Sequence, residues 1–314
     1  MCIYNLVKNV VITNRKKNMN RIFLHKRKPL DSKTFDLRAA YNQSRIEIIL
    51  TNFSRNLIGA TALKTRLSEL ATLSVMQIVR VYFAMLRPPI GLHMSFTGPT
   101  GTGKSYVARK LGKLLWGLGY LQKGHLIHVT RYELIGQFVG STAPKTQQRL
   151  NASLGGIFFL DEAYYLVKPN NDRDYGREAI EMILQFMENN RGKFVAIFAG
   201  YADKMNLFYS INPGLASRVL NHIIFDNFTD AEIEELLNQE LNTTMYKTTS
   251  KAKERALCVL KKERELSLKW ANARTITTLV SLSRLEHALR LVKKSGILTT
   301  KDLWTIKQSD IKLL

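Results

Sequence analysis

Two short segments carry residues whose types and spacing could perform phosphate chemistry. The first is a complete GxxxxGK[ST] motif over residues 98–105, read as GPTGTGKS. Glycines let backbone N–H groups turn toward nucleotide phosphates, and the following helix directs its positive dipole end at the same anion. We expect Lys104 to reach the β- and γ-phosphates and the Ser105 hydroxyl to bind Mg²⁺. The predicted nucleotide-binding residues here are Gly98, Pro99, Thr100, Gly101, Thr102, Gly103, Lys104, Ser105 and the adjoining Tyr106.

The second segment is a pair of acids that follows a wholly apolar run. Ile157–Leu160 reads as a buried strand, and Asp161 and Glu162 come directly after it. A buried parallel strand delivers its last side chains to the carboxyl edge of the sheet, where a phosphate loop also lies. We expect Asp161 to bind the nucleotide's Mg²⁺ and Glu162 to polarise the attacking water. A solvated turn, the alternative, rarely follows four large apolar residues.

Strands and helices alternate around these two segments. A strand-like run at 93–97 leads into the phosphate loop, helical periodicity begins near Lys104, and a third apolar run follows at 194–200. Helical spacing of apolar residues also occurs at 57–79 and 177–190. This alternation predicts an α/β fold, in which a parallel sheet is covered by helices on both faces.

The pattern changes after Asp226 to helices without strand-like runs. We therefore predict a small all-α lid domain joined by a hinge at 225–229. Its expected helices span residues 231–241, 251–266 and 276–293, with the tail at 297–313 packed against them. The predicted division is a basic extension at 1–50, an α/β nucleotide-binding domain at 51–228 and the lid at 229–314.

The chain has 314 residues and a formal net charge of +22, from 47 Lys and Arg against 25 Asp and Glu. Such an excess raises nucleic acid or a membrane surface as a partner. The excess is spread along the chain, however, and only the N-terminus is dense in basic residues. The two cysteines and six histidines show no disulfide or metal-ligand spacing, and we interpret the histidines as scaffold residues. No apolar run approaches the about 18 residues that cross a bilayer, so we expect a soluble protein.

The N-terminus is basic, with eight Lys or Arg before the first acid, Asp31. This composition is typical of an organelle transit peptide, although the absence of serine from residues 1–30 counts against one. A disordered basic tail, or an upstream extension of a chain that starts at Met19, explains the composition equally well. Both interpretations stay open, and we exclude the segment from the fold.

Several sequence blocks identify a family when they are taken in combination. They lie at residues 92–98, 123–126, 140–146, 160–166, 174–176, 178–181, 187–189, 199–201 and 212–214. From about Leu57 to its end, the chain resembles the CbbX (CbxX/CfqX) family of AAA+ ATPases. These are the red-type Rubisco activases of proteobacteria and red-lineage plastids.

The resemblance implies an ATPase that works as a ring, expected to be a homo-hexamer. Ser217 and Arg218 match the family's arginine-finger segment, which implies that Arg218 reaches the γ-phosphate held by the neighbouring subunit. A planar cation there accelerates phosphoryl transfer by about 10³ to 10⁵. Residues 272–274 match the start of the lid helix with the second sensor, which implies that Arg274 contacts the same subunit's phosphates. The only polar candidate for the first sensor is Tyr201.

Residues 137–140 resemble the aromatic pore loop with which such rings grip a polypeptide. Phe138 supplies the aromatic side chain, and Gly136 and Gly140 favour a loop over a helix. The alternative is that Phe138 belongs to the core. The chain departs from the family at three single positions: Ser141 stands where the family commonly has His, Phe138 where it commonly has Tyr, and Ala216 where it has Arg. The sequence of the phosphate loop also differs, but it keeps every required chemical group.

We therefore predict an ATP-hydrolysing motor that remodels a protein substrate with ATP and Mg²⁺. The family implies release of inhibitory sugar phosphates from red-type Rubisco, with its large subunit as substrate, ribulose 1,5-bisphosphate as effector and the plastid stroma as location. The alternative is a nucleic-acid-directed AAA+ protein of the clamp-loader or branch-migration type, for which the net charge is the main argument. We do not expect a membrane or nucleic acid as a partner. A P-loop kinase would have no role for Asp161, Glu162 and a finger at Arg218.

Overall fold

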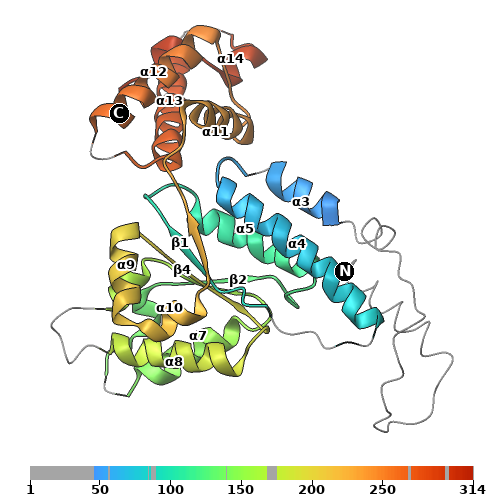
Figure 1. The fold of residues 1–314 in the computed structure, drawn as a ribbon. Helices are drawn as coiled ribbons and strands as arrows, with labels where there is room; N and C mark the ends of the chain where they lie inside the picture. The colour runs from blue at the N-terminus through green and yellow to red at the C-terminus, as the bar shows by residue number, and fades with distance from the viewer. Residues whose placement is uncertain are drawn as a thin grey trace, which may run out of the picture. The chain divides into compact units, whose positions relative to one another are not determined.

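A computed structural model describes residues 46–55, 57–83, 85, 90–138, 140–167, 175–267, 270–293 and 297–313 (Figure 1). The chain divides into two compact units. The first, the α/β unit, takes the described residues up to Thr97 together with Ser105–Ile224. The second, the lid unit, takes Gly98–Lys104 and Phe225–Leu314. Most of the predicted N-terminal extension lies outside the described residues.

A five-stranded parallel sheet forms the centre of the α/β unit, in the order β2-β3-β4-β1-β5. The strands are β1 Met94–Thr97, β2 Leu126–Val129, β3 Ile157–Leu160, β4 Val195–Gly200 and β5 Asn221–Ile224. Because all the strands run in one direction, their carboxyl ends share one edge, from which the chain leaves β1 toward Gly98 and β3 toward Asp161. This confirms the predicted fold class.

Helices cover both faces of this sheet. The helical elements are α3 Ile46–Arg55, α4 Thr61–Tyr82, α5 Lys104–Gly117, α6 Arg131–Leu134, α7 Thr142–Ala152, η1 Ala163–Leu166, α8 Gly176–Asn189, α9 Ala202–Ile211 and α10 Pro213–Arg218. In Figure 1, α4 and α5 lie on one side of the sheet and α7 to α10 on the other. The second face packs the apolar side chains of α7 to α10 against Phe158 and Phe198, which are fully buried.

The central strands follow from their sequences, whereas the edge strands were not predicted. Every residue of β3 and β4 is buried, as expected for strands with neighbours on both sides and helices on both faces. Of the outer strands, β5 alternates between buried and exposed residues, whereas only the last residue of β2, Val129, is buried. Their polar residues, such as His128 and Asn221, interrupt the apolar runs by which a strand is recognised.

The helix predicted at residues 57–79 begins later than its apolar spacing indicates. Gly59 and Ala60 have φ angles of 71° and 50°, in the left-handed region that interrupts a right-handed helix. Leu57 and Ile58 therefore precede α4, and their periodicity with the helix is coincidental. A separate helix, α3, comes before them.

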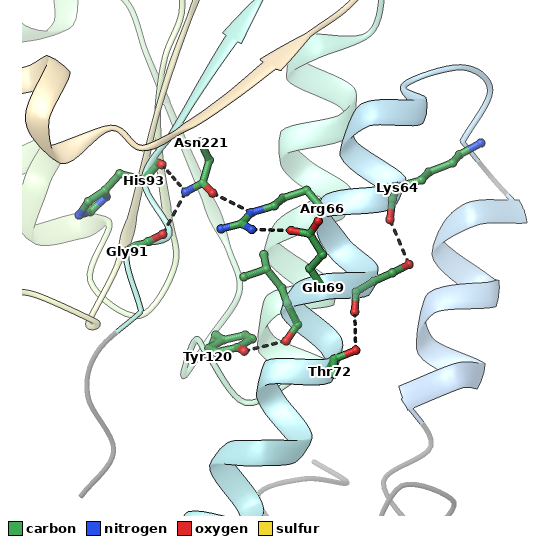
Figure 2. A network of polar contacts seen from close by, with 10 residues as sticks. Lys64, Arg66, Glu69, Thr72, Gly91, His93, Tyr120 and Asn221 are labelled. Atoms are coloured by element: carbon green, nitrogen blue, oxygen red, sulfur yellow. Dashed lines mark hydrogen bonds and ion pairs between the residues drawn. The ribbon is translucent and has the colours of Figure 1, made fainter.

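A polar network joins α4 to the start of two strands (Figure 2). Arg66 Nε donates to Asn221 Oδ1 at 2.8 Å, and its Nη1 pairs with Glu69 at 2.5 Å. Asn221 Nδ2 in turn donates to the carbonyl oxygens of Gly91 and His93, at 2.9 and 3.0 Å. The buried Asn221 side chain thereby fixes the chain that enters β1 against the first residue of β5.

The lid unit is helical, with capped helix starts. Its elements are α11 Asp230–Thr243, β6 Lys247–Thr248, α12 Ser250–Leu266, α13 Ala273–Lys293, α14 Thr300–Trp304, β7 Thr305–Ile306 and η2 Gln308–Asp310. Thr229 and Glu232 form a capping box that begins α11, and Thr249 caps α12. The two-residue parallel pair of β6 and β7 corrects the expectation of helices alone. Two-residue strands are too short to show an alternating pattern.

A buried ion pair fastens the end of the chain to α13. Arg290 Nε and Nη2 donate to the two carboxylate oxygens of Asp310, at 2.7 and 2.9 Å. Burial raises the pKa of Asp310, but the hydrogen bonds from Arg290 and the Lys307 N–H outweigh it and hold the pKa below its ordinary value. The predicted packing of the 297–313 tail against the lid is thus provided by a charged pair as well as by Ile306 and Ile311.

Candidate nucleotide site

The phosphate loop lies between the end of β1 and the start of α5, as predicted. Gly98, Gly101 and Gly103 have φ angles of 148°, 72° and 89°, which side-chain-bearing residues rarely adopt. Lys104 is 9% exposed, and its Nζ donates to the carbonyl oxygens of Gly98 and Pro99, both at 2.7 Å. The ammonium group therefore lies inside the loop that would surround the phosphates.

Two of these glycines are also required by close approach of other backbone. A Cβ on Gly98 would lie 2.1 Å from the carbonyl oxygen of Phe225, and one on Gly101 would lie 1.8 Å from that of Ala271. The loop thus packs directly on the hinge segment and on the residues that lead into α13. Any larger residue at either glycine would push the loop away from them.

Arg274, the predicted second sensor, comes directly after the residue that joins the lid helix to the phosphate loop. It is the second residue of α13, and its side chain is exposed. The preceding residue, Ala273, donates its N–H to the carbonyl oxygen of Gly101 at 3.1 Å. The lid unit therefore brings the start of α13 against the middle of the phosphate loop.

Asn272 organises this contact, and its role was not foreseen from the sequence. It is fully buried with a φ angle of 50°. Its Nδ2 donates to the Thr100 carbonyl at 3.1 Å and to Asn227 Oδ1 at 2.9 Å. Its Oδ1 accepts from the N–H of Phe228 at 3.2 Å and from Trp270 Nε1 at 3.3 Å. One amide side chain therefore joins the phosphate loop, the hinge and the start of α13.

The two acids lie at the carboxyl edge of the sheet, as predicted. The Asp161 N–H continues the pairing with β2 by donating to the Val129 carbonyl at 2.9 Å. Glu162 then adopts φ 49° and ψ 49°, a left-handed conformation that is unfavourable for any residue other than glycine. Its Oε2 is buried without a hydrogen-bond partner in the described part of the chain. A buried, unpaired carboxylate oxygen suits a group that must accept a hydrogen bond from a water molecule.

His128 contacts Asp161, and this contact was not predicted from the sequence. Its Nε2 lies 3.3 Å from Asp161 Oδ2, and its ring stacks on Phe159 with centroids 5.5 Å apart. The hydrogen bond to Asp161 raises the pKa of His128 above its ordinary value. The signal in the sequence is a polar residue within an otherwise apolar run at 126–129, which is recognisable only once that run is known to neighbour β3.

The metal-ion chemistry of these residues fits Mg²⁺ better than a transition metal. A carboxylate at Asp161 and a hydroxyl at Ser105 are hard oxygen ligands of the kind that Mg²⁺ takes alongside nucleotide oxygens and water. Among the described residues there is no cluster of three or more His, Cys, Asp and Glu that could hold a metal by itself. Tyr106, beside Ser105 in α5, is 45% exposed and lies under the Lys110 ammonium.

Arg218, the predicted finger, is the last residue of α10 and lies at the surface of the α/β unit. Its Nη1 donates to the Gly214 carbonyl at 3.0 Å, one turn earlier in the same helix. Its Nε donates to Glu188 Oε2 at 3.3 Å. The Arg218 side chain is 37% exposed and is held by partners on α8 and α10.

Tyr201, the candidate first sensor, follows β4 and precedes α9. The Lys204 ammonium lies over the rings of both Tyr164 and Tyr201, at 4.8 and 5.4 Å. Burial and the nearby Glu162 carboxylate raise the pKa of Tyr164 above its ordinary value. Two tyrosines and a lysine therefore stand beside the acid pair at this edge of the sheet.

Phe138, which was predicted to lie on a pore loop, is exposed. Its side chain is 76% accessible, which excludes the alternative of a core residue. Ser141 closes the turn: its Oγ donates to the Phe138 carbonyl at 2.5 Å and accepts from the Phe138 N–H at 3.1 Å. The Gly136 N–H donates to Thr142 Oγ1 at 3.1 Å. The hydroxyl groups of Thr142 and Ser141 therefore bind the backbone of Gly136 and of Phe138.

Within the described ranges, no helix combines the length and apolar character that crossing a membrane would require.

Two family models match the chain. The model of the AAA family, described as ATPases associated with various cellular activities, matches residues 94–227. A model of the AAA lid domain matches residues 229–313. The chain is 46% identical over 279 residues to the chloroplastic ribulose bisphosphate carboxylase/oxygenase activase of Cyanidioschyzon merolae, covering 88% of this chain and 95% of that protein. It is 44% identical over 280 residues to Protein CbbX of Cereibacter sphaeroides, covering 89% and 90%.

Among solved structures, a mutant of RuvB from Thermotoga maritima matches with a TM-score of 0.51 and 18% identity, over 79% of this chain and 70% of that one. At this identity the match concerns the fold alone.

Proposed function

The chain belongs to the CbbX/CfxQ family of AAA ATPases, and from that premise we propose that it is a Rubisco activase, an ATP-driven motor that remodels red-type Rubisco. The observation that carries the proposal is the conjunction of a complete phosphate loop with the buried, unpaired carboxylate oxygen of Glu162. The names of relatives that are 44 to 46% identical over nearly their whole length supply the substrate class.

We assign the ATPase chemistry to six residues. Lys104 and Arg274 would bind the phosphates of ATP within one subunit, and Glu162 would orient the attacking water. Asp161 and Ser105 would hold Mg²⁺, which when bound neutralises charge on the phosphate oxygens. Arg218 would act on the nucleotide of the neighbouring subunit in a ring, which we expect to be a hexamer.

We assign the grip on the protein substrate to Phe138. An exposed aromatic ring on a glycine-flanked loop offers apolar area that engages varied side chains. Ser141 stands where the family commonly has histidine, and both its hydroxyl and its backbone N–H bind the Phe138 backbone. Pulling on the Rubisco large subunit in this way would open its site and release a bound sugar phosphate.

The effector and the location follow from the same family. Ribulose 1,5-bisphosphate is the sugar phosphate we expect to stimulate the ATPase. The plastid stroma is the proposed location, since one relative is described as chloroplastic and the N-terminus has the charge of a transit peptide.

The experiment is steady-state ATPase activity of the full chain, with and without ribulose 1,5-bisphosphate, red-type Rubisco or duplex DNA. Stimulation by the sugar phosphate and Rubisco, abolished by Glu162→Gln and by Arg218→Ala, supports the activase function. Stimulation by DNA alone, with a steep dependence on salt, would replace it with a nucleic-acid-directed motor, the function for which the net charge of +22 argues.

A further inference from the structure

Three charged side chains gather between α8 and α10, and we call them the finger cluster: Glu188, Arg191 and Arg218. Arg218 is bound on both sides within its own subunit, to Glu188 Oε2 at 3.3 Å and to the Gly214 carbonyl at 3.0 Å. A residue proposed to act on a neighbouring nucleotide therefore has partners that it must leave first.

Glu188 is shared between two arginines. Arg191, three residues further along the chain, binds Oε1, while Arg218 binds Oε2. The hydrogen bond from Arg191, followed by the charges of both arginines, lowers the pKa of Glu188. The carboxylate is therefore ionised at neutral pH, and it keeps a cation beside it when Arg218 leaves.

The contact between Arg218 and Glu188 is suited to exchange. Their side chains are 37% and 41% exposed, so water and salt weaken the attraction. The terminal phosphate of ATP carries more negative charge than a carboxylate and offers an arginine two parallel hydrogen bonds. A neighbouring subunit with ATP bound can therefore take the guanidinium group from Glu188, whereas a subunit without nucleotide offers no comparable partner.

We propose that Glu188 is a positioning residue that holds Arg218 within its own subunit until the neighbour presents ATP. Arg191 neutralises the carboxylate that Arg218 leaves, and so assists the exchange. The inference rests on the proposed function of Arg218 as a finger in trans. It predicts effects of opposite sign: loss of the Glu188 charge frees Arg218, whereas loss of Arg191 strengthens the hold of Glu188 on it.

The test uses mixed rings of the full chain. Acceptor subunits carry Arg218→Ala and keep Glu162, and donor subunits carry Glu162→Gln and keep Arg218. Each is expected to be nearly inactive alone, and mixing restores phosphate release at acceptor sites that face a donor's Arg218. Rates are measured at an ATP concentration below the KM, where the finger competes with its holding contact.

Changes are then added to the donor alone. Donors with Glu188→Gln are expected to raise the rate about two- to fivefold, the factor that corresponds to an exposed ion pair. Donors with Arg191→Ala are expected to lower it by a similar factor. Glu181→Gln, on the same helix two turns earlier, is the matched control and is expected to leave the rate unchanged. Each donor must retain the thermal unfolding midpoint and the ring size of the unmodified chain.

The outcomes separate the two proposals. Equal rates with Glu188→Gln and Glu181→Gln donors, or a lower rate with Glu188→Gln donors, overturn the role of Glu188. A decrease with both the Glu188 and the Arg191 change points to packing and overturns it as well. If plain Glu162→Gln donors restore no activity to Arg218→Ala acceptors, the action of Arg218 in trans fails, and the inference about Glu188 falls with it.

Discussion

The two units each contain an arginine bound to a carboxylate, and the two pairs differ in almost every physical respect. In the lid unit, Arg290 makes two hydrogen bonds to Asp310, whose side chain is 2% exposed. In the α/β unit, Arg218 makes one hydrogen bond of 3.3 Å to a carboxylate that is 41% exposed and shared with Arg191. The first pair, which we call the enclosed pair, is buried and bidentate. The second, the open pair, is exposed to solvent, and its carboxylate is shared between two arginines.

This difference separates a structural contact from an exchangeable one. Opening the Arg290–Asp310 pair would leave an ionised carboxylate buried, which is costly, so the pair stays closed while the lid is folded. Opening the Arg218–Glu188 pair exposes both groups to water and leaves Arg191 in place, so little stability is at stake. The same residue types therefore form an enclosed contact in one unit and an exposed, exchangeable contact in the other.

The largest expected effect is on catalysis and comes from the open pair. Arg218→Ala is expected to lower the kcat for ATP hydrolysis by about 10³ to 10⁵, since it removes the cation proposed to stabilise charge in the transition state. Urea denaturation of the same variant should show no loss of stability. A stable ring that hydrolyses ATP at the unmodified rate would show that Arg218 is no finger.

The next effect is on stability and comes from the enclosed pair. Arg290→Met is expected to cost about 3 kcal/mol of unfolding free energy, because Asp310 would remain buried without its counter-charge. The double variant with Asp310→Leu should recover much of this loss. Denaturation measured by circular dichroism tests both variants. If Arg290→Met is as stable as the unmodified chain, the Arg290–Asp310 pair contributes as little stability as the exposed Arg218–Glu188 pair.

A third test concerns a group that the fold keeps uncharged. His93 Nδ1 accepts the Ala196 N–H at 2.9 Å, and burial lowers the pKa of His93 from 6.5 to about 4. Protonation therefore favours the unfolded chain as pH falls below 6.5. Between pH 7.5 and 5 we expect a loss of about 2 kcal/mol of stability that His93→Gln does not show. Parallel pH profiles of the two proteins would contradict the assignment.

The smallest expected effect is on stability and comes from removing the exposed pair of Arg218 and Glu188. Glu188→Gln should leave the urea midpoint of the isolated chain unchanged in both low and high salt, because the pair that it removes is exposed. A clear loss of stability, relieved by Arg218→Met in the same chain, would show that the finger cluster is structural after all.

The parts of the fold that were predictable are those whose burial is uniform. The runs 157–160 and 194–200 are apolar throughout because β3 and β4 have neighbouring strands on both sides and helices on both faces. The phosphate loop can be recognised from the sequence because its chemistry fixes both residue type and spacing. The lid helices were predicted from regular apolar spacing. These features depend on local sequence alone.

What could not be predicted depends on residues distant in the sequence. The contact of His128 with Asp161 requires knowing that β2 pairs with β3, and the two segments are about thirty residues apart. The four hydrogen bonds of Asn272 join segments from residue 100 to residue 272. No single stretch of sequence carries that information, although Asn272 stood within the motif that includes Arg274.

The hydrogen bonds of Asn272 and the close approaches at Gly98 and Gly101 make the phosphate loop part of the lid unit. This bears on how such motors can be recombined. A lid exchanged between relatives at the hinge would arrive without the loop backbone that its own residues 271–274 contact. Chimeras that carry residues 98–104 together with their own lid should fold correctly. Chimeras joined only at residue 225 should combine a phosphate loop from one relative with lid residues from another that do not fit it.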